Sequence, residues 1–384
     1  MDFRLTEEQE LLVSSLKELL EREAPESLIA KLDEEHEFPW KLWKALADNG
    51  FSGLGVSEDY GGTPADYTTQ MLVGQTLAKY AFPVGFVYSL SMMTSKTIGT
   101  FGSPEQKALI LGDIIKGGPP VALGISEPQA GSDTASIKTT AVLEGENYVL
   151  NGQKIYCTMA HVAKYIMCMT RDPKIENPYK GISMFLLPTN AKGVRVNPLR
   201  KVGLWPVSTC EVFIDNVVLP KSALIGELNN GFKQLMEHFE VERLAVGSLG
   251  IGSAEAAFED AAQYASQRIQ FGKPIGSFQL VQEMLTNMAI KLENMRNMAL
   301  KVSWMMDNHM DVRIENALLK LYGARASFEV VDDAMQILGG VGYMMDHRVQ
   351  RLWRDIRVLR IGGGTDEVMI HIAGPQIVKK YAAK

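Results

Sequence analysis

The spacing of apolar residues changes twice along this chain of 384 residues, and that change limits the folds open to it. From Thr6 to about Lys116, apolar residues recur every three or four positions, as on amphipathic helices. After about Pro119, short apolar or alternating runs indicate strands instead. Helical spacing returns near Gly226 and continues almost to the end. This order predicts an α+β fold, mostly α, and disfavours the βαβ alternation of a Rossmann domain.

Three domains are expected from these changes: an N-terminal helical domain at 1–117, a small antiparallel β domain at 118–226, and a C-terminal four-helix bundle at 227–384. In the first domain, one helix is expected from about Ala65 to Lys79. In the second, Asn151-Gly152 between two apolar runs predicts a type I′ hairpin turn. The bundle helices are expected from about Phe232 to Gln267, Gln279 to Asn308, Val312 to Leu338 and Glu367 to Tyr381.

Composition excludes several classes of function. The net charge is −6 and no basic run occurs, which argues against nucleic-acid binding. Three cysteines without a CxxC pair argue against a disulfide framework and fit a reducing compartment. The acidic start and the lack of an 18-residue apolar stretch argue against a signal peptide or a membrane span. We therefore expect a soluble cytoplasmic protein. The histidines lack metal-ligand spacing, so no metal is expected.

Five short motifs follow one another in a specific order. They are Glu127 to Asp133 (EPQAGSD), Asn151 to Thr158 (NGQKIYCT), Gln267 to Ile275 (QRIQFGKPI), Gln336 to Gly342 (QILGGVG), and Trp353-Arg354-Asp355 followed by Gly364 to Glu367 (GTDE). Each alone could be a turn or a helix end. Together they closely resemble the acyl-CoA dehydrogenase family of flavoenzymes over nearly the whole chain, most of all its crotonobetainyl-CoA reductase branch.

The chemistry of that family places its own demands on the residues. Desaturating a thioester requires a base for the α-proton and an acceptor for the β-hydride, and no side chain accepts a hydride. The base must be a carboxylate or equivalent in a dry pocket, where desolvation raises its pKa toward neutrality. The thioester carbonyl needs hydrogen-bond donors. The resemblance implies that FAD is the acceptor.

One set of residues is implied to surround the flavin ring. It consists of Leu123, Ile125, Ser126, Ser132, Tyr156 and Thr158. Thr158 matches a threonine that bonds flavin N5, and Tyr156 replaces a commoner tryptophan, so that aromatic stacking is kept. Ser132 is also implied to contact substrate. The alternative for this set is a turn followed by a half-buried strand.

A second set is implied to bind the FAD of a neighbouring subunit. It consists of Arg268, Gln270, Phe271, Gln336 and Gly340. Arginine suits a pyrophosphate because its planar fork donates to two oxygens, although Arg268 could also be a solvated helix charge. Thr365 and Glu367 are implied to lie near the cofactor at the opening of the last helix. The implied assembly is a homodimer, or a homotetramer built as a pair of dimers.

The position of the base departs from the commoner family pattern. Many members carry it in a Tyr-Glu-Gly-Thr loop, but here that loop reads Gly362-Gly363-Gly364-Thr365, which puts Gly363 at the base position. Taken alone, this would suggest an inactive protein. A smaller group places the base on a helix in a segment that matches Phe239 to Arg243, and this match puts Glu242 at the base position. Gly363 would then leave room for Glu242 or for an acyl group. Arg243 is implied to contact CoA or to anchor a loop.

Three rival interpretations stay open, as does a surface role for Glu242. We expect an FAD-dependent acyl-CoA dehydrogenase or enoyl-CoA reductase that exchanges electrons with electron-transferring flavoprotein. The rivals are an acyl-CoA oxidase, a flavoprotein acting on a substrate other than a CoA thioester, and a non-catalytic FAD-binding assembly protein. Met92 and its neighbours could line an acyl pocket, and His238 is expected to face solvent or a neighbour.

Overall fold

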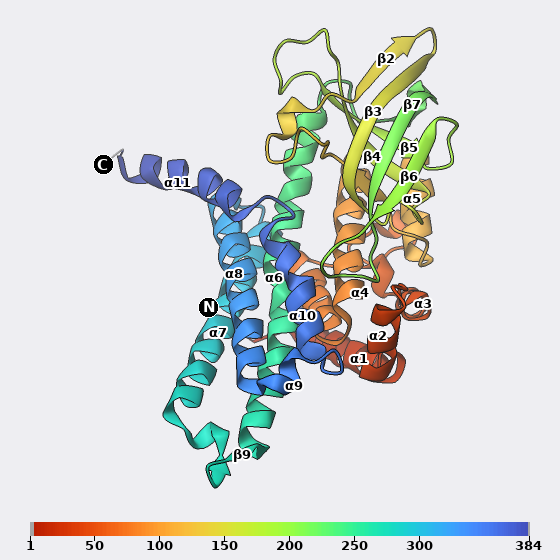
Figure 1. Ribbon diagram of the computed structural model, residues 1–384. Coiled ribbons are helices and arrows are strands. Elements are labelled where there is room, and N and C mark those ends of the chain that lie inside the picture. The colour runs from red at the N-terminus through yellow and green to blue at the C-terminus, as the bar shows by residue number, and fades with distance from the viewer. Residues whose placement is uncertain (1–3, 383–384) are drawn as a thin grey trace.

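The computed structural model describes residues 4–382 and begins with a group of helices (Figure 1). They are α1 (Glu7–Glu23), α2 (Glu26–Glu34), α3 (Trp40–Asp48), α4 (Tyr67–Phe101) and α5 (Pro104–Ile115). At the start of α1, the Thr6 hydroxyl accepts from the backbone N–H of Gln9, and the Gln9 side chain accepts from that of Thr6, each at 3.2 Å. This capping box fixes where α1 begins.

Helix α4 is longer than the helix predicted from Ala65 to Lys79. At Ala81 the backbone leaves the helical region (φ −149°, ψ 82°), and Pro83 follows inside the same element. Proline has no N–H to donate to the preceding turn, which accounts for the interruption of the helical hydrogen bonds there. The segment after the kink is nevertheless buried, and packing therefore restores the helix up to Phe101.

The middle of the chain forms one hydrogen-bonded sheet of eight strands. Its order is β6-β7-β3-β2-β4-β5-β8, with β1 paired to β4. The strands are β1 (Ala122–Gly124), β2 (Thr140–Glu144), β3 (Asn147–Thr158), β4 (Tyr165–Arg171), β5 (Ile182–Pro188), β6 (Val194–Leu199), β7 (Thr209–Pro220) and β8 (Leu224–Ile225). Most neighbours are antiparallel, whereas β1 and β2 each pair with β4 in parallel.

The predicted hairpin turn at Asn151-Gly152 is wrong. Both residues lie inside β3, at an irregularity where the register with β7 shifts between Leu150 and Gly152. The chain instead reverses between β2 and β3 at Gly145, whose φ of +62° favours glycine. Gly152 serves a close approach, because a Cβ there would lie 2.4 Å from the Thr139 hydroxyl. The hydrogen-bonded pairing of β3 with its neighbours therefore outweighed the local preference of Asn-Gly for a turn.

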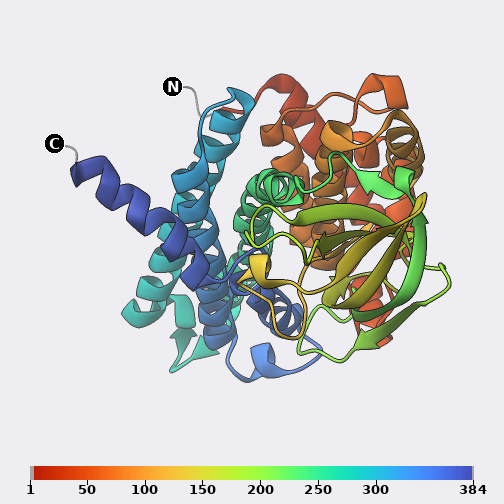
Figure 2. The same cartoon turned by 90° about the horizontal axis from the view of Figure 1, so that it is seen from above.

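Helices again make up the remainder, and three of the four expected long helices lie side by side (Figures 1 and 2). The elements are α6 (Gly231–Gln267), α7 (Gln279–Asp307), α8 (Arg313–Leu338), α9 (Gly340–Tyr343), α10 (Arg348–Ile356) and α11 (Asp366–Ala382), with a small hairpin of β9 (Ile269–Gln270) and β10 (Lys273–Pro274) between α6 and α7. The fourth, α11, packs its first turns near Ala317 of α8 and then projects outward (Figure 2). The α+β class with this three-part order is confirmed.

The Trp353-Arg354-Asp355 motif joins all three parts of the chain. Arg354 donates to the buried Asp33 of α2, and its guanidinium lies 3.7 Å from the centre of the Trp205 ring. Asp355 accepts from the backbone N–H of Leu204. No helix within residues 4–382 has the length and apolar character that a bilayer crossing requires.

Candidate active site

Glu242 is half-buried and its Oε2 is enclosed, which argues against a surface role. It lies in the first third of α6, and within residues 4–382 its buried Oε2 has no hydrogen-bond partner. Burial raises the pKa of Glu242 to about 7, although the positive charges of Arg243 and Lys320 oppose that shift. A carboxyl group that titrates near neutrality can take a proton from a substrate and later release it.

Gly363 faces the Glu242 carboxylate. A Cβ on Gly363 would lie 3.3 Å from Glu242 Oε1 and 3.4 Å from its Cγ. Gly363 and Gly364 both have positive φ, +66° and +94°, which L side chains rarely adopt. The structure thus brings together the two positions that the sequence pattern linked, and the glycine leaves the space that the carboxylate uses.

Arg243 is buried beside Glu242. Its guanidinium lies 5.5 Å from the centre of the Phe239 ring, on the preceding turn of α6. Burial lowers the pKa of Arg243, and the nearby Glu242 partly reverses this. Its buried Nε has no hydrogen-bond partner within the described part of the chain. A buried arginine with an unused donor is suited to bind an anionic or carbonyl group of a ligand.

The loop after β1 is fixed to β3 by two contacts. The backbone N–H of Ile155 donates to Ser126 O at 2.9 Å, and Lys154 Nζ donates to Ile125 O at 3.2 Å. Leu123 and Ile125 are half-buried, whereas Ser132, further along the loop, is exposed. The loop after β1 and the last part of β3 are therefore held next to each other.

A buried ion pair between Lys154 and Glu127 joins this loop to β3. Lys154 Nζ lies 2.7 Å from Glu127 Oε1, and both side chains are almost fully buried. Glu127 also accepts from the backbone N–H groups of Lys138 at 2.6 Å and Thr139 at 2.9 Å. Burial alone would raise the pKa of Glu127, but the charge of Lys154 and these hydrogen bonds hold it below its usual value. The charges of Glu127 and Lys154 neutralise each other, and we therefore infer that this pair stabilises the loop and takes no part in catalysis.

Tyr156 points outward from an irregular part of β3. The register between β3 and β7 shifts between Lys154 and Cys157, and Tyr156 has a φ of +62°. Its side chain is 66% exposed, which is high for a residue within a strand. Thr158 follows, half-buried and paired with Thr209. Such bulges redirect side chains next to binding sites, and a flat aromatic ring presented to solvent suits a planar ligand.

The second predicted set, the residues implied to bind the FAD of a neighbouring subunit, lies near the end of α6 that is far from the sheet (Figure 1). Helix α6 starts against β5, where a Cβ on Gly231 would lie 2.8 Å from Ser183 Cα, and ends 37 residues later beside Arg268. At 1.5 Å per residue this is a length of about 55 Å. Phe271 is 94% exposed on the β9–β10 hairpin. The set Arg268, Gln270, Phe271, Gln336 and Gly340 is therefore not brought to Tyr156 within one chain.

Thr365 and Glu367 lie where predicted, at the opening of α11. The Thr365 hydroxyl accepts from the backbone N–H of Val368 at 3.3 Å and so caps this helix. Glu367 is exposed in its first turn. Thr365 follows Gly363 by two residues and Glu367 follows it by four, so both are close in sequence to the glycine that faces Glu242.

Two polar residues near Glu242 were not identified from the sequence as parts of a site. Lys320 of α8 is fully buried and donates to Gly364 O. His238 is buried rather than facing solvent, and its Nδ1 lies 2.7 Å from the hydroxyl of Thr97. Burial lowers the pKa of His238 to about 4, so the ring is neutral. For both Lys320 and His238, the only sequence signal of burial was a single polar residue among apolar residues at helical spacing.

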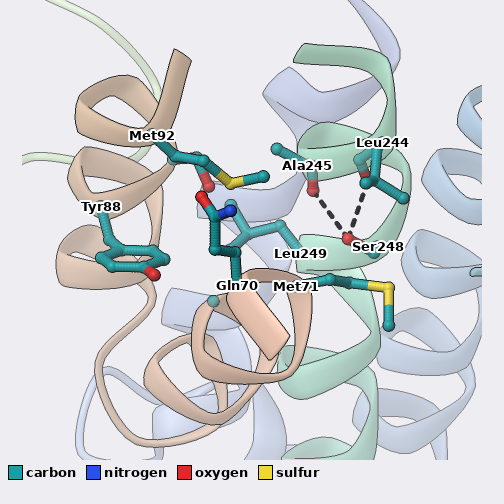
Figure 3. Close-up of a pocket in the computed structure, with 10 residues that line it drawn as sticks. Gln70, Met71, Tyr88, Met92, Leu244, Ala245, Ser248 and Leu249 are labelled. Carbon is teal, nitrogen blue, oxygen red and sulfur yellow. Dashed lines mark hydrogen bonds between the residues drawn. The ribbon is translucent and has the colours of Figure 1, made fainter. Parts of the chain in front are cut away.

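A small cavity lies between α4 and α6 (Figure 3). It has a volume of about 10 Å³, room for about one water molecule. Ala245 and Leu249 line it and follow Glu242 at i+3 and i+7, and thus lie on its face of α6. Tyr88 and Met92 of α4 close the other side. Met92 thus lines the same cavity as Ala245, which is one turn after Glu242 on α6. Among residues 4–382, no group of three or more His, Cys, Asp or Glu could hold a metal ion.

Three family profiles cover most of the chain. "Acyl-CoA dehydrogenase, N-terminal domain" matches residues 6–118, the "middle domain" matches 122–217, and the "C-terminal domain" matches 229–378. Together with the fold, these matches define a flavin-dependent oxidoreductase that acts on a CH–CH bond. The chain belongs to the acyl-CoA dehydrogenase family.

Individual relatives agree with that assignment. The chain is 46% identical to "Probable acyl-CoA dehydrogenase YdiO" of Escherichia coli (strain K12) over 385 residues, with 100% of both proteins covered. It is 29% identical to the solved butyryl-CoA dehydrogenase of Megasphaera elsdenii, with a TM-score of 0.93 and 98% and 100% of the chains covered. A chain from a structure described as the electron transferring flavoprotein of Acidaminococcus fermentans is 31% identical, with a TM-score of 0.94 and 99% and 100% covered.

Proposed function

We propose that this protein is an FAD-dependent acyl-CoA dehydrogenase or enoyl-CoA reductase in which Glu242 exchanges the α-proton of a CoA thioester. The observation that carries the proposal is the position of Gly363 against the carboxylate of Glu242, whose buried Oε2 has no hydrogen-bond partner within residues 4–382. A glycine at the usual base position would explain an inactive protein, but here the space beside it holds a carboxylate whose pKa burial raises to about 7. Membership in the crotonobetainyl-CoA reductase branch remains part of this proposal.

FAD fits the surface at the end of β3. Tyr156 offers an exposed ring beside the loop of Ile125 and Ser126, and Thr158 offers a hydroxyl one step further along the strand. We place the flavin ring against these residues, with Leu123 and Ser132 at its edges and with Thr365 and Glu367 on the side of α11. When bound, FAD supplies the hydride acceptor that side chains lack.

The protein's own residues would position the substrate and move one proton. Glu242 receives the α-proton on its carboxylate in the oxidative direction and returns it in the reductive direction. Arg243, whose Nε is unpartnered within residues 4–382, would bind the CoA side of the substrate or its loop. The acyl end would extend along α6 toward Tyr88 and Met92, where the cavity must widen to admit it. Methionine side chains are adaptable enough to allow this.

A complete FAD site would need a second subunit. Arg268, Gln270 and Phe271 lie about 55 Å along α6 from its sheet end. Gln336 lies in the last turn of α8, and Gly340 follows that helix. A homodimer could bring these residues to the FAD of the other chain, and two dimers could form a tetramer. The exposed Phe271 supports such an interface.

Electron-transferring flavoprotein is the proposed electron partner, supported by the similar chain in the Acidaminococcus fermentans structure. We propose a cytoplasmic location, which the three buried, unpaired cysteines support. The division at 1–117, 118–226 and 227–384 is likewise a proposal. If oxygen consumption matched turnover without electron-transferring flavoprotein, the enzyme would be an oxidase instead.

The test is anaerobic reduction of the FAD-loaded protein by butyryl-, isovaleryl- and octanoyl-CoA. We expect at least one to bleach the flavin. Glu242→Gln should keep FAD and acyl-CoA binding but reduce the flavin 10²–10⁴-fold more slowly, because an amide cannot accept the proton. Glu237→Gln, which removes a half-buried acid from the same helix, is the matched control and should react normally. Wild-type speed in Glu242→Gln would refute the proposal.

A further inference from the structure

Lys320 is a fully buried lysine that the proposed reaction does not use. Its side chain is 0% exposed, and Nζ donates to the carbonyl oxygen of Gly364. Buried lysines are rare unless they are paired with a carboxylate, and within residues 4–382 no carboxylate lies in direct ion-pair contact with this one. Such a costly arrangement calls for an explanation.

The backbone at Lys320 is held tightly against the helix that carries Glu242. Gly247 of α6 allows this, because a Cβ there would lie 3.0 Å from both Cα and N of Lys320. One turn earlier on α8, Asn316 Nδ2 donates to Glu240 O at 2.6 Å. The α8 helix therefore contacts α6 through Asn316 and the loop before α11 through Lys320.

These two contacts lie on either side of Glu242. Asn316 binds α6 two residues before it, and Lys320 binds Gly364, the neighbour of the Gly363 that faces its carboxylate. The hydrogen bond to Gly364 O limits how far the loop can move from Glu242. Since both residues come from one rigid helix, they fix the loop and the base relative to each other.

The charge of Lys320 also acts on Glu242. It opposes the rise in the pKa of Glu242, as Arg243 on α6 does. The other charged groups around Lys320 are Asp366 and Glu367 at the start of α11, and Asp366 is engaged by Arg325 and Arg360. Burial lowers the pKa of Lys320 itself to about 8, so it is mostly protonated at pH 7.

We propose that Lys320 is a positioning residue for proton transfer, one that holds the Gly362–Gly364 loop against Glu242 and favours the ionised carboxylate. This inference rests on the proposed function of Glu242. A purely structural lysine would affect stability alone, whereas a positioning lysine also changes the pH at which Glu242 becomes active.

Three substitutions separate the hydrogen bond from the charge. Lys320→Gln keeps a donor of similar reach but no charge, Lys320→Met keeps neither, and Lys320→Arg keeps both. In each FAD-loaded variant, the rate of flavin reduction by the fastest of butyryl-, isovaleryl- and octanoyl-CoA is measured from pH 5.5 to 9.5. FAD content and urea unfolding identify the variants that fold, and Lys320→Gln is the least disruptive of them.

We expect the midpoint of the pH profile to rise by about one unit in Lys320→Gln and Lys320→Met, which gives an about tenfold lower rate below the midpoint. At high pH, Lys320→Gln should reach the wild-type rate, whereas Lys320→Met should stay several-fold below it. Lys320→Arg should restore the wild-type midpoint. Lys291→Met, which removes a lysine paired with Glu329 on the neighbouring helix, is the control and should leave the profile unchanged.

Two outcomes overturn the inference, and they are distinguishable. If flavin reduction by Lys320→Gln has the wild-type pH midpoint and still depends on Glu242, then Lys320 has no positioning role, and the assignment of Glu242 as the base is unaffected. An active Glu242→Gln removes the base assignment and this inference with it. A second readout needs no turnover: the difference in unfolding free energy between the parent and its Glu242→Gln variant, measured against pH, reports the pKa of Glu242. It should shift upward in the Lys320→Gln background.

Discussion

Glu127 and Glu242 are two glutamates with enclosed carboxylate oxygens but opposite surroundings. Glu127, under the loop that supports Tyr156, is paired with Lys154 at 2.7 Å and accepts two backbone N–H groups, so its pKa is held below its usual value. Glu242 has no such pairing for Oε2 within the described residues, and burial raises its pKa to about 7. Fully partnered buried charges fix a structure, whereas a poorly partnered one is available for chemistry.

Removing the charge of Glu127 should give the largest loss of stability. Glu127→Gln leaves the ammonium group of Lys154 buried without a counter-charge, and breaking a buried pair costs about 3–5 kcal/mol. Urea unfolding of the FAD-free protein measures this loss. Binding of FAD should weaken as well, because Lys154 also holds Ile125.

The double variant Glu127→Gln/Lys154→Met is the control for that experiment. It removes both charges and should recover much of the stability, since no unpaired charge stays buried. A single variant as stable as the wild type would show that the pair does not support the loop.

The corresponding change at Glu242 should have the opposite sign. The folded pKa of about 7 lies above the reference value of 4.5, so the penalty is absent below pH 4.5, grows between these values, and is complete above pH 7. Glu242→Gln should therefore raise the free energy of unfolding at pH 8 by about 3 kcal/mol, from about 2.5 pKa units at 1.36 kcal/mol each. Near pH 4.5 the two proteins should unfold alike. A variant less stable at pH 8 would contradict this account of Glu242.

A smaller effect is expected from Gly363→Ala. An L residue at a φ of +66° costs about 1–2 kcal/mol, and the added Cβ would lie 3.3 Å from Glu242 Oε1. Gly145→Ala is a matched control, because Gly145 has a φ of +62° but nothing within 4 Å of an added Cβ. Urea unfolding should show similar losses in both, and only Gly363→Ala should slow flavin reduction. If Gly363→Ala and Gly145→Ala reduced the flavin at the same rate, the loop at Gly363 would have no influence on Glu242.

Much of the fold could be predicted because most of its signals are patterns that extend over many residues. The change from helical to alternating spacing near Pro119 extends over many residues, and the capping box at Thr6 has a local cause that packing does not override. The turn predicted at Asn151-Gly152 was wrong because it rested on a two-residue signal, which the ladder of β3 outweighed. The helix end expected near Lys79 falls beside the kink at Ala81, after which the buried segment is helical again.

The candidate site could be predicted only in part. The missing carboxylate at Gly363 and the acid at Glu242 are visible as residue types, but only the structure places one against the other. Lys320 could not be found, because a lysine in a helix is usually solvated and its contact with Gly364 joins segments 44 residues apart. The length of α6 was predicted closely, but only the structure shows that the sheet lies against its first residues and Arg268 at its other end.

The contact between Arg354 and Asp33 has a consequence for how the chain is made. These residues are 321 positions apart, so at 5–20 residues per second the ribosome adds Arg354 roughly 15–60 s after Asp33. During that interval the Asp33 carboxylate lacks the cation that pairs with it in the folded protein, so its burial among the first helices is disfavoured. We expect the final packing of the earliest helices to be completed only after nearly the whole chain has been made.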